Sequence, residues 1–256
     1  MNLFLFRSSH PADVRILVII PTAGISRTML RKCLRRLRRA AGRMELKTIL
    51  VLCPYDPGRK QKVLTTMDTE DKLICLPPPF SFARSNNVAL AELSDEEYVL
   101  FLNDDCFFRG RGDLLKLLKT MREENLACIG PWLEHWQCHD ELPPESRTDG
   151  TVYSPRPLIG ACILWDAAWL KKTGFFDELF SGYGMEEADL LLRTLRQGGR
   201  WARDDRICVD HIHHATVGES IKSQEPHLRN LRRWQEKYPG IHYWGEGEPW
   251  AKNVCG

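Results

Sequence analysis

The sequence lacks any long apolar segment. Its longest apolar runs, at 16–21 and 98–102, are far shorter than the roughly 20 residues that a membrane-spanning helix needs. The first 15 residues lack the basic region, the apolar core and the small-residue cleavage site of a secretory signal peptide. These two absences argue against a membrane-spanning protein and a secreted one, and we expect a cytoplasmic protein.

Cysteine pairs at metal-ligating spacing are also missing. The nine cysteines are an odd number, and no two of them form a C-x-x-C pair. A disulfide framework and a zinc ribbon are therefore not expected. Several of the cysteines fall in apolar runs, where a reduced cysteine acts as a small hydrophobic residue, so we expect a reducing compartment.

An excess of one charge is absent too. Lys and Arg number 36 against 34 Asp and Glu, which leaves a net charge of +2 and gives no reason to expect a nucleic-acid partner. A chain that is 43% hydrophobic and 27% charged is neither disordered nor fibrous. Its 256 residues suffice for one large domain with a sizeable core.

What the sequence does contain is an alternation of short apolar runs and amphipathic stretches. We expect strands at 15–20, 48–53, 72–76, 98–102 and 126–129, and helices at 27–41, 58–67, 82–93 and 112–124. This alternation predicts an α/β fold, with a mostly parallel sheet and helices on both faces.

The pattern stops near residue 131 and resumes later in the chain. Further along we expect an ordered segment at 158–165, a helix at 185–197, a strand at 207–211 and a helix near 226–238. We divide the chain into one domain, residues 1–220, and a C-terminal helix and tail, residues 221–256, packed on or beside that domain.

Polar residues directly follow the strand expected at 98–102. Sheets of this kind bind ligands at the carboxyl ends of their strands, and Asn103, Asp104 and Asp105 lie at that place. Their oxygens suit a hard divalent cation, Mg²⁺ or Mn²⁺, that bridges to phosphate oxygens. The alternative is a solvated turn held by a hydrogen bond from an Asp or Asn side chain.

Two acids open the helix expected at 185–197. Glu186 and Glu187 lie in its first turn, where acids complement the helix dipole, and Asp189 can pair with Arg193 four residues on. A carboxylate at this place can instead face a cleft and accept a proton from a bound hydroxyl. Both interpretations stay open at this point.

Three histidines lie at the end of the last expected strand. His211 and His213 share one face of an extended segment, whereas His214 points to the other face. A pair on one face can ligate a metal, and a hydrogen-bonded packing role is the alternative for each histidine. Three histidines within four residues favour a ligand.

Taken together, these clusters resemble the inverting GT-A glycosyltransferases, especially glycosyltransferase family 2, over residues 15–240. The matching segments are 18–22 (VIIPT, the first strand), 82–90 (FARSNNVAL, the a-R-x-N-x-G helix start), 102–105 (LNDD, the DXD segment), 160–162 (GAC, the acceptor-side strand), 174–193 (the G-x-F-D-E-x-F to E-D-x-D-L-x-x-R block) and His211 with Thr216 (the H-x-x-x-x-S/T element). The block at 174–193 is the most specific of them.

The resemblance implies a Rossmann-like GT-A fold and the inverting transfer of a sugar from a nucleotide-diphosphate-sugar (UDP, dTDP or GDP) to a hydroxyl of a glycan or lipid-linked glycan. It implies a Mn²⁺ or Mg²⁺ cofactor on Asp105 and His211, with His213 as a further candidate. Glu187 would be the general base, with Glu186 as the second candidate. The nucleotide site would be lined by Thr22, Asp56, Arg84, Asn87, Asn103 and Asp104.

The chain departs from the family's pattern at three places. Asn103 replaces the first Asp of the DXD segment, and Glu187 replaces the usual Asp. The segment 52–56 (LCPYD) matches the family's D-G-S-x-D turn only loosely, which leaves the nucleotide open. We expect acceptor recognition in the polar stretch 131–157, which contains Trp132, His135, Trp136 and Tyr153, because aromatic faces stack on sugar rings.

Other functions stay open beside this one. A sugar-phosphate nucleotidyltransferase would need a glycine-rich loop after the first strand, and 21–26 holds one glycine. The stretch 31–43 holds seven basic residues and no acid, which suits peripheral contact with the inner face of a membrane, RNA binding, or a solvated outer helix face. A catalytically inactive scaffold of the same fold is a further alternative.

Overall fold

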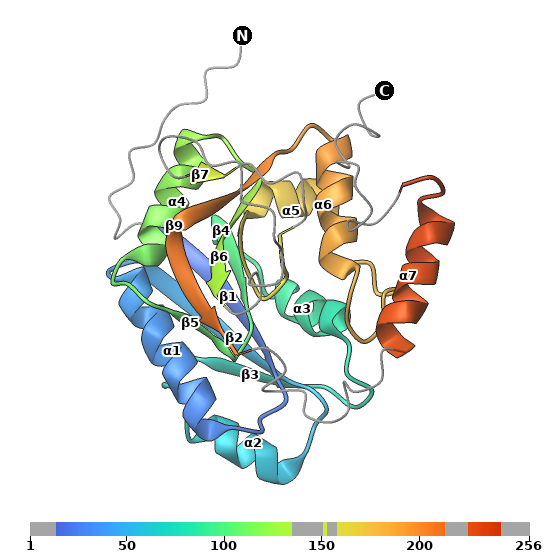
Figure 1. The fold of residues 1–256 in the computed structure, drawn as a ribbon. Helices are drawn as coiled ribbons and strands as arrows, with labels where there is room; N and C mark the ends of the chain where they lie inside the picture. Colours follow the sequence, from blue (N-terminus) through green and yellow to red (C-terminus); the bar gives the residue numbers. More distant parts are fainter. Residues whose placement is uncertain (1–13, 135–150, 153–157, 213–224, 242–256) are drawn as a thin grey trace.

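The computed structural model describes residues 14–134, 151–152, 158–212 and 225–241, which form a curled mixed sheet with helices on both faces (Figure 1). The strands are β1 (Arg15–Thr22), β2 (Glu45–Leu52), β3 (Lys72–Cys75), β4 (Tyr98–Leu102), β5 (Cys106–Phe108), β6 (Cys128–Glu134), β7 (Thr151–Val152), β8 (Cys162–Asp166) and β9 (Trp201–His211). The helices are α1 (Arg27–Ala41), α2 (Pro57–Leu64), α3 (Phe82–Leu90), α4 (Asp113–Glu123), α5 (Ala167–Thr173), α6 (Glu186–Arg196) and α7 (Glu225–Lys237).

The strand order is β3-β2-β1-β4-β8-β6-β9-β5, and β7 pairs with β9. The first four strands of this order run parallel, as the alternation predicts. The rest of the sheet is mixed, because β8 runs antiparallel to β4 and β6, and β9 runs parallel to β6 but antiparallel to β5 and β7. The α/β prediction is confirmed, but the sheet is less parallel than expected, since β8 enters it from a segment without strand-helix alternation.

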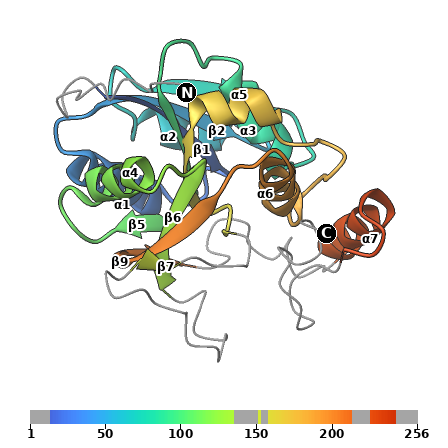
Figure 2. The same cartoon turned by 90° about the horizontal axis from the view of Figure 1, so that it is seen from above.

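Alternating side chains of β1 supply two cores. Ile16 and Val18 pack into the core that α1 and α4 cover, and Leu17 and Ile19 pack into the core that α3 and α6 cover. Because both faces are covered, every residue of β4 is buried and the strand is a continuous apolar run. Figure 2 shows α1 and α4 on one side of the sheet and α3, α5 and α6 on the other.

Helix α1 forms where the sequence predicts it. Its N-cap residue Ser26 accepts a hydrogen bond from the Met29 N–H at 3.2 Å, and Gly42 ends the helix with a φ of 67° that glycine adopts without strain. The buried side chains at 30, 33, 34 and 37 form one apolar stripe against the sheet. The basic residues of α1 are therefore turned away from the core.

Other elements differ from the expectation in extent. β9 begins at Trp201 rather than near 207, because its first half is charged and does not look like a buried strand. Within it Asp204 is fully buried and accepts hydrogen bonds from Thr120 at 2.8 Å and from the Arg206 side chain at 2.6 Å. The short elements β5 and α5 were not expected, because they contain too few residues to show a period.

The C-terminal helix α7 lies beside α6 in both views (Figures 1 and 2). Trp234 and Tyr238 are buried in the core on that face of the sheet, and the Trp234 indole N–H donates to the Ile241 carbonyl at 3.0 Å. The boundary at residue 220 stays a prediction. No helix in the described part of the chain has the length and apolar character needed to cross a membrane.

Candidate active site

The carboxyl ends of β1 and β4 meet at one polar contact. The Thr22 hydroxyl donates a hydrogen bond of 2.5 Å to Oδ2 of Asp104, and both side chains are buried. The same hydroxyl accepts a hydrogen bond from the Gly24 N–H at 3.0 Å. Two of the predicted nucleotide-site residues, 82 positions apart in the sequence, are thereby brought together.

The next residue, Asp105, faces the last strand. Its Oδ1 lies 3.5 Å from Nε2 of His211, and its carbonyl accepts a hydrogen bond from the Ile212 N–H at 3.1 Å. Both side chains are buried, and no described residue gives Asp105 Oδ1 a hydrogen bond. A buried carboxylate oxygen in this position costs free energy unless a cation offsets it.

A third possible ligand, Cys106, lies beside them. Cys106 is directly opposite His211 in the β5–β9 ladder, so the two side chains lie on the same face of the sheet. The ligand atoms of Asp105, Cys106 and His211 all lie within 4.8 Å of one another. This oxygen, nitrogen and sulfur set fits a divalent transition metal better than it fits Mg²⁺, which prefers oxygen ligands alone. His213 lies outside the described residues.

The two acids of α6 lie in different surroundings. Glu186 is 2% exposed, its Oε2 has no hydrogen-bond partner among the described residues, and burial together with the charge of Glu187 raises its pKa well above the usual range. Glu187 is half-buried, and burial raises its pKa while the Gly160 N–H opposes that rise. Burial therefore favours Glu187 as the carboxylate that an incoming ligand can reach.

Gly160 leaves room for this arrangement. A Cβ at Gly160 would lie 3.3 Å from the Phe82 ring and 3.6 Å from Cβ of Glu187. The first of these distances is tighter than ordinary van der Waals contact, so a side chain at residue 160 would press on α3. The glycine therefore lets the segment before β8 approach α3 and α6 closely.

Helix α6 begins after a left-handed turn that other elements support. Gly184 and Met185 have φ values of 94° and 76°, the second of which is uncommon outside glycine. The Asn230 side-chain amide of α7 donates to the carbonyls of Ser181, Tyr183 and Gly184 at 3.1, 3.2 and 2.9 Å. Helix α7 thus holds the turn that sets the direction of Glu186 and Glu187.

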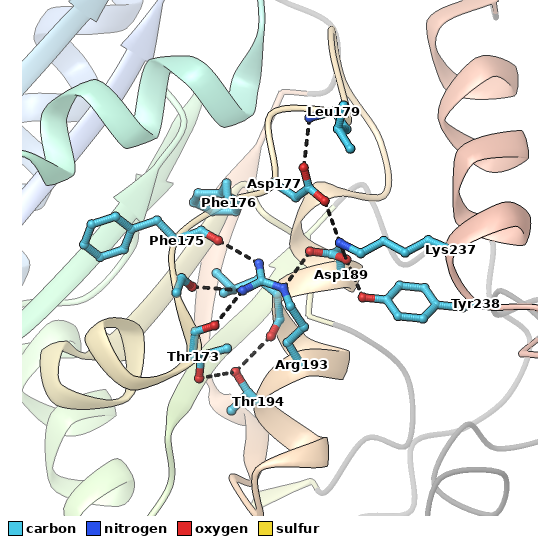
Figure 3. A network of polar contacts seen from close by, with 12 residues as sticks. Thr173, Phe175, Phe176, Asp177, Leu179, Asp189, Arg193, Thr194, Lys237 and Tyr238 are labelled. Atoms are coloured by element: carbon cyan, nitrogen blue, oxygen red, sulfur yellow. Dashed lines mark hydrogen bonds and ion pairs between the residues drawn. The ribbon is translucent and has the colours of Figure 1, made fainter.

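A buried ion-pair network ties α6 to its neighbours (Figure 3). Asp189 is fully buried and accepts from Arg193 at 2.8 Å and from the Tyr238 hydroxyl at 2.5 Å. Arg193 also donates to the carbonyls of Thr173 and Phe175 at 2.8 and 2.7 Å. The predicted Asp189–Arg193 pair is confirmed, and it holds the segment that precedes the helix.

The remaining predicted nucleotide-site residues are less closely grouped. Asp56 caps α2 by accepting from the Arg59 N–H at 2.7 Å. The Asn87 amide donates to the Phe176 carbonyl at 2.9 Å and to Glu178 at 3.0 Å, which gives Asn87 a structural contact. Arg84 is half-buried at the start of α3, and Asn103 is half-buried beside Asp104. A nucleotide contact for these four residues stays a prediction.

Three residues that contribute to this region were not predicted from the sequence. Cys106 adjoins the DXD-like segment, and the signal that could have found it is its place one residue after Asp105. Asn230 and Lys237 lie on α7, far from the acids along the chain, and no spacing points to them. Most of the stretch 131–157 and Thr216 lie outside the described residues, so the expected acceptor region is described only at 131–134 and 151–152.

Comparison by sequence finds no match: no protein-family model matches the chain, and no curated protein matches it. Comparison of structures does find matches. GalNAc-T7, solved with UDP, GalNAc and Mn²⁺, has a TM-score of 0.68 at 12% identity over 87% of this chain. The chain has a GT-A glycosyltransferase fold.

Two further structures share this GT-A fold. The mannosyltransferase PcManGT from Pyrobaculum calidifontis, solved with GDP-Man and Mn²⁺, has a TM-score of 0.62 at 14% identity over 95% of this chain and 69% of its own. S. aureus TarS has a TM-score of 0.55 at 16% identity over 76% of this chain and 36% of its own. The chain spans about half of GalNAc-T7, 48% of its length.

Proposed function

We propose that this protein transfers a glycosyl group from a nucleotide-diphosphate-sugar to an acceptor hydroxyl, with inversion at the anomeric carbon. One observation carries the proposal: on a GT-A fold, a buried Asp105–Cys106–His211 group lies at the end of β4, and a pair of acids with raised pKa opens α6. Two proteins of the same fold support a nucleotide-linked donor, because one was solved with UDP and GalNAc and the other with GDP-Man.

The cation in this proposal is held by Asp105 and His211, with Cys106 as a third ligand. When bound, a divalent cation supplies charge stabilisation for the leaving diphosphate. Asp104 is fixed by the Thr22 hydroxyl at the carboxyl end of β1, which is where a parallel sheet of this kind binds a nucleotide. The half-buried Arg84 makes no hydrogen bond or ion pair through its guanidinium with the described residues, so it is available for an anionic donor group.

In this proposal Glu187 and Glu186 have different roles in proton transfer. Glu187 is half-buried and accepts the proton of the acceptor hydroxyl as its oxygen bonds to the anomeric carbon and the bond to the diphosphate breaks. Glu186 is more deeply buried, and burial together with the charge of Glu187 raises its pKa well above the usual range, so Glu186 is the acid assigned the neutral form. Two neighbouring carboxyls with different burial thus give one ionised base and one neutral partner.

Thermal unfolding of the full chain tests the donor site. We would measure the midpoint with UDP, GDP, dTDP and CDP, each with and without Mn²⁺, since a ligand that binds only the folded state raises it. A rise for one nucleotide that requires Mn²⁺ and is lost in Asp105→Asn supports the proposal. Asp95→Asn is the matched control, because Asp95 is exposed on the segment that precedes β4, at the opposite end of that strand from Asp105.

Activity separates an enzyme from an inactive scaffold. The wild-type chain should release the nucleoside diphosphate from the donor sugar that the thermal measurement selects, and Glu187→Gln should lower that rate by about 10² or more. Nucleotide binding without any release, in wild type as in Glu187→Gln, would assign the chain to the scaffold alternative. No midpoint shift with any nucleotide would overturn the proposed donor class.

A further inference from the structure

The outer face of α1 carries a row of arginines that the proposed function does not use. Arg27, Arg31, Arg35 and Arg39 recur one helical turn apart, and Arg43 continues the row just beyond the helix. All five side chains are exposed, and none makes a hydrogen bond or an ion pair with the described residues. We call these five residues the arginine row.

The other bases of α1 are already engaged. Arg38 pairs with Asp68 at 3.0 Å and with Asp71 at 2.7 Å, and the Lys32 ammonium lies 4.1 Å from the centre of the Phe107 ring. Helix α1 contains no acid. Like charges one turn apart repel each other, so the row carries a repulsion that an anionic partner would relieve.

The size and composition of the row indicate the kind of partner. From Arg27 to Arg39 it extends about 18 Å along one straight helix, at about 1.5 Å per residue. Ile25, which is 41% exposed, precedes the row in the sequence by two residues. Bases on one face with apolar side chains at its edge are typical of a surface that rests on anionic lipid. The row holds no aromatic side chain on which a nucleic-acid base could stack.

We propose that the arginine row binds the phosphate groups of an anionic lipid surface and holds the protein peripherally on that membrane. A guanidinium group can donate two parallel hydrogen bonds to the oxygens of one phosphate. Each base near such a surface adds its own contribution to the binding free energy. The row begins beside the candidate active site, because Ser26 caps α1 two residues after Gly24, whose N–H donates to Thr22. An acceptor carried by the same membrane would therefore be close to the site.

Vesicle co-sedimentation of the full chain tests this proposal and does not depend on the proposed activity. The probes are vesicles of phosphatidylcholine alone and of equal parts phosphatidylcholine and phosphatidylglycerol. The test variant replaces Arg27, Arg31, Arg35 and Arg39 with Gln. The matched control replaces Lys171, Lys172, Arg200 and Arg232, which are exposed on the other helices and on the segment before β9, with Gln. Each variant loses four positive charges, so both change the net charge from +2 to −2.

We expect the wild-type chain and the control to bind the anionic vesicles and not the neutral ones. The row variant should bind about 600-fold more weakly, because each of its four replaced bases near an anionic surface contributes roughly a fivefold factor. Its unfolding midpoint should match that of wild type, since the replaced side chains are exposed. Equal loss in the control, or no loss in the row variant, would overturn the proposal. So would absence of vesicle binding together with row-dependent binding of double-stranded RNA, which would assign the row to nucleic acid.

Discussion

The Lys237 ammonium lies 2.7 Å from the Asp189 carboxylate, which places a cation from α7 against a fully buried acid of α6. The same ammonium also lies 2.5 Å from Asp177, on the segment that leads to the helix (Figure 3). The C-terminal helix therefore neutralises the charge inside the element that carries both candidate bases. Removing α7 would leave a buried carboxylate with one cationic partner fewer.

Tyr238→Phe tests this network with the smallest change. The substitution removes the hydroxyl that donates to Asp189 at 2.5 Å and keeps the ring in the core. We expect the free energy of unfolding to fall by about 1–3 kcal/mol, because the lost hydrogen bond goes to a buried charged group. Denaturant unfolding measures the change. Tyr55→Phe is the control, since Tyr55 is 45% exposed, and an equal loss there would contradict the prediction.

Glu187→Gln and Glu186→Gln should separate the roles of the two acids. Glu187→Gln removes the base and should lower kcat by 10²–10⁴, while the rise in the unfolding midpoint that the donor nucleotide causes is retained. Glu186→Gln replaces the neutral acid by an isosteric amide and should lower kcat by about tenfold at most. Like a protonated carboxyl, the amide has both a hydrogen-bond donor and an acceptor. Steady-state kinetics of both variants measures this. A larger loss in Glu186→Gln than in Glu187→Gln would exchange the two assignments.

Glu186 should also make stability depend on pH. Its pKa is raised in the folded chain, so the stability that it contributes is full below its unfolded pKa near 4.5 and is lost as pH rises through the folded pKa. Glu186→Gln removes this loss. We expect the variant to match wild type near pH 4 and to be more stable than wild type at pH 8, in thermal unfolding at both values. A variant that gains nothing at pH 8 would show that Glu186 is not held in its neutral form.

Cys106→Ser should change which metal the site prefers. A thiolate ligand favours Co²⁺ and Zn²⁺ over Mg²⁺, and it gives bound Co²⁺ a sulfur-to-metal charge-transfer band. We expect wild type to show that band and to bind Co²⁺ about tenfold or more tightly than the variant does. Cys75→Ser, a half-buried thiol on β3, is the control. If wild type shows no such band, Cys106 is not a ligand, and the cation is held by Asp105 and His211 alone.

The sequence predicted the candidate site well where local patterns carry it. Asp104 and Asp105 follow a continuous apolar run, and that run becomes β4, the strand in the middle of the sheet whose end lies at the site. Glu186 and Glu187 follow two glycines, and they do open a helix. In each case a strand or helix boundary fixes the position of the side chain.

Other parts could not be predicted because they depend on long-range packing. Asn87 matches the family's helix-start motif, but its amide hydrogen-bonds a loop 89 residues away. Asn230 contacts the turn before α6 only because Trp234 packs in the core and thereby holds α7 against that turn. The antiparallel direction of β8 and the charged first half of β9 also follow from their neighbours rather than from a period in the sequence.

The strand order has a consequence for the time at which the site forms. Only three residues separate β4 from β5, yet the two strands lie far apart in the order, and the sheet partner of β5 is β9. During synthesis from the N-terminus, Asp105 therefore cannot contact His211 until residue 211 has emerged from the ribosome. A growing chain that ends before β9 has the parallel half of the sheet but no complete cation site.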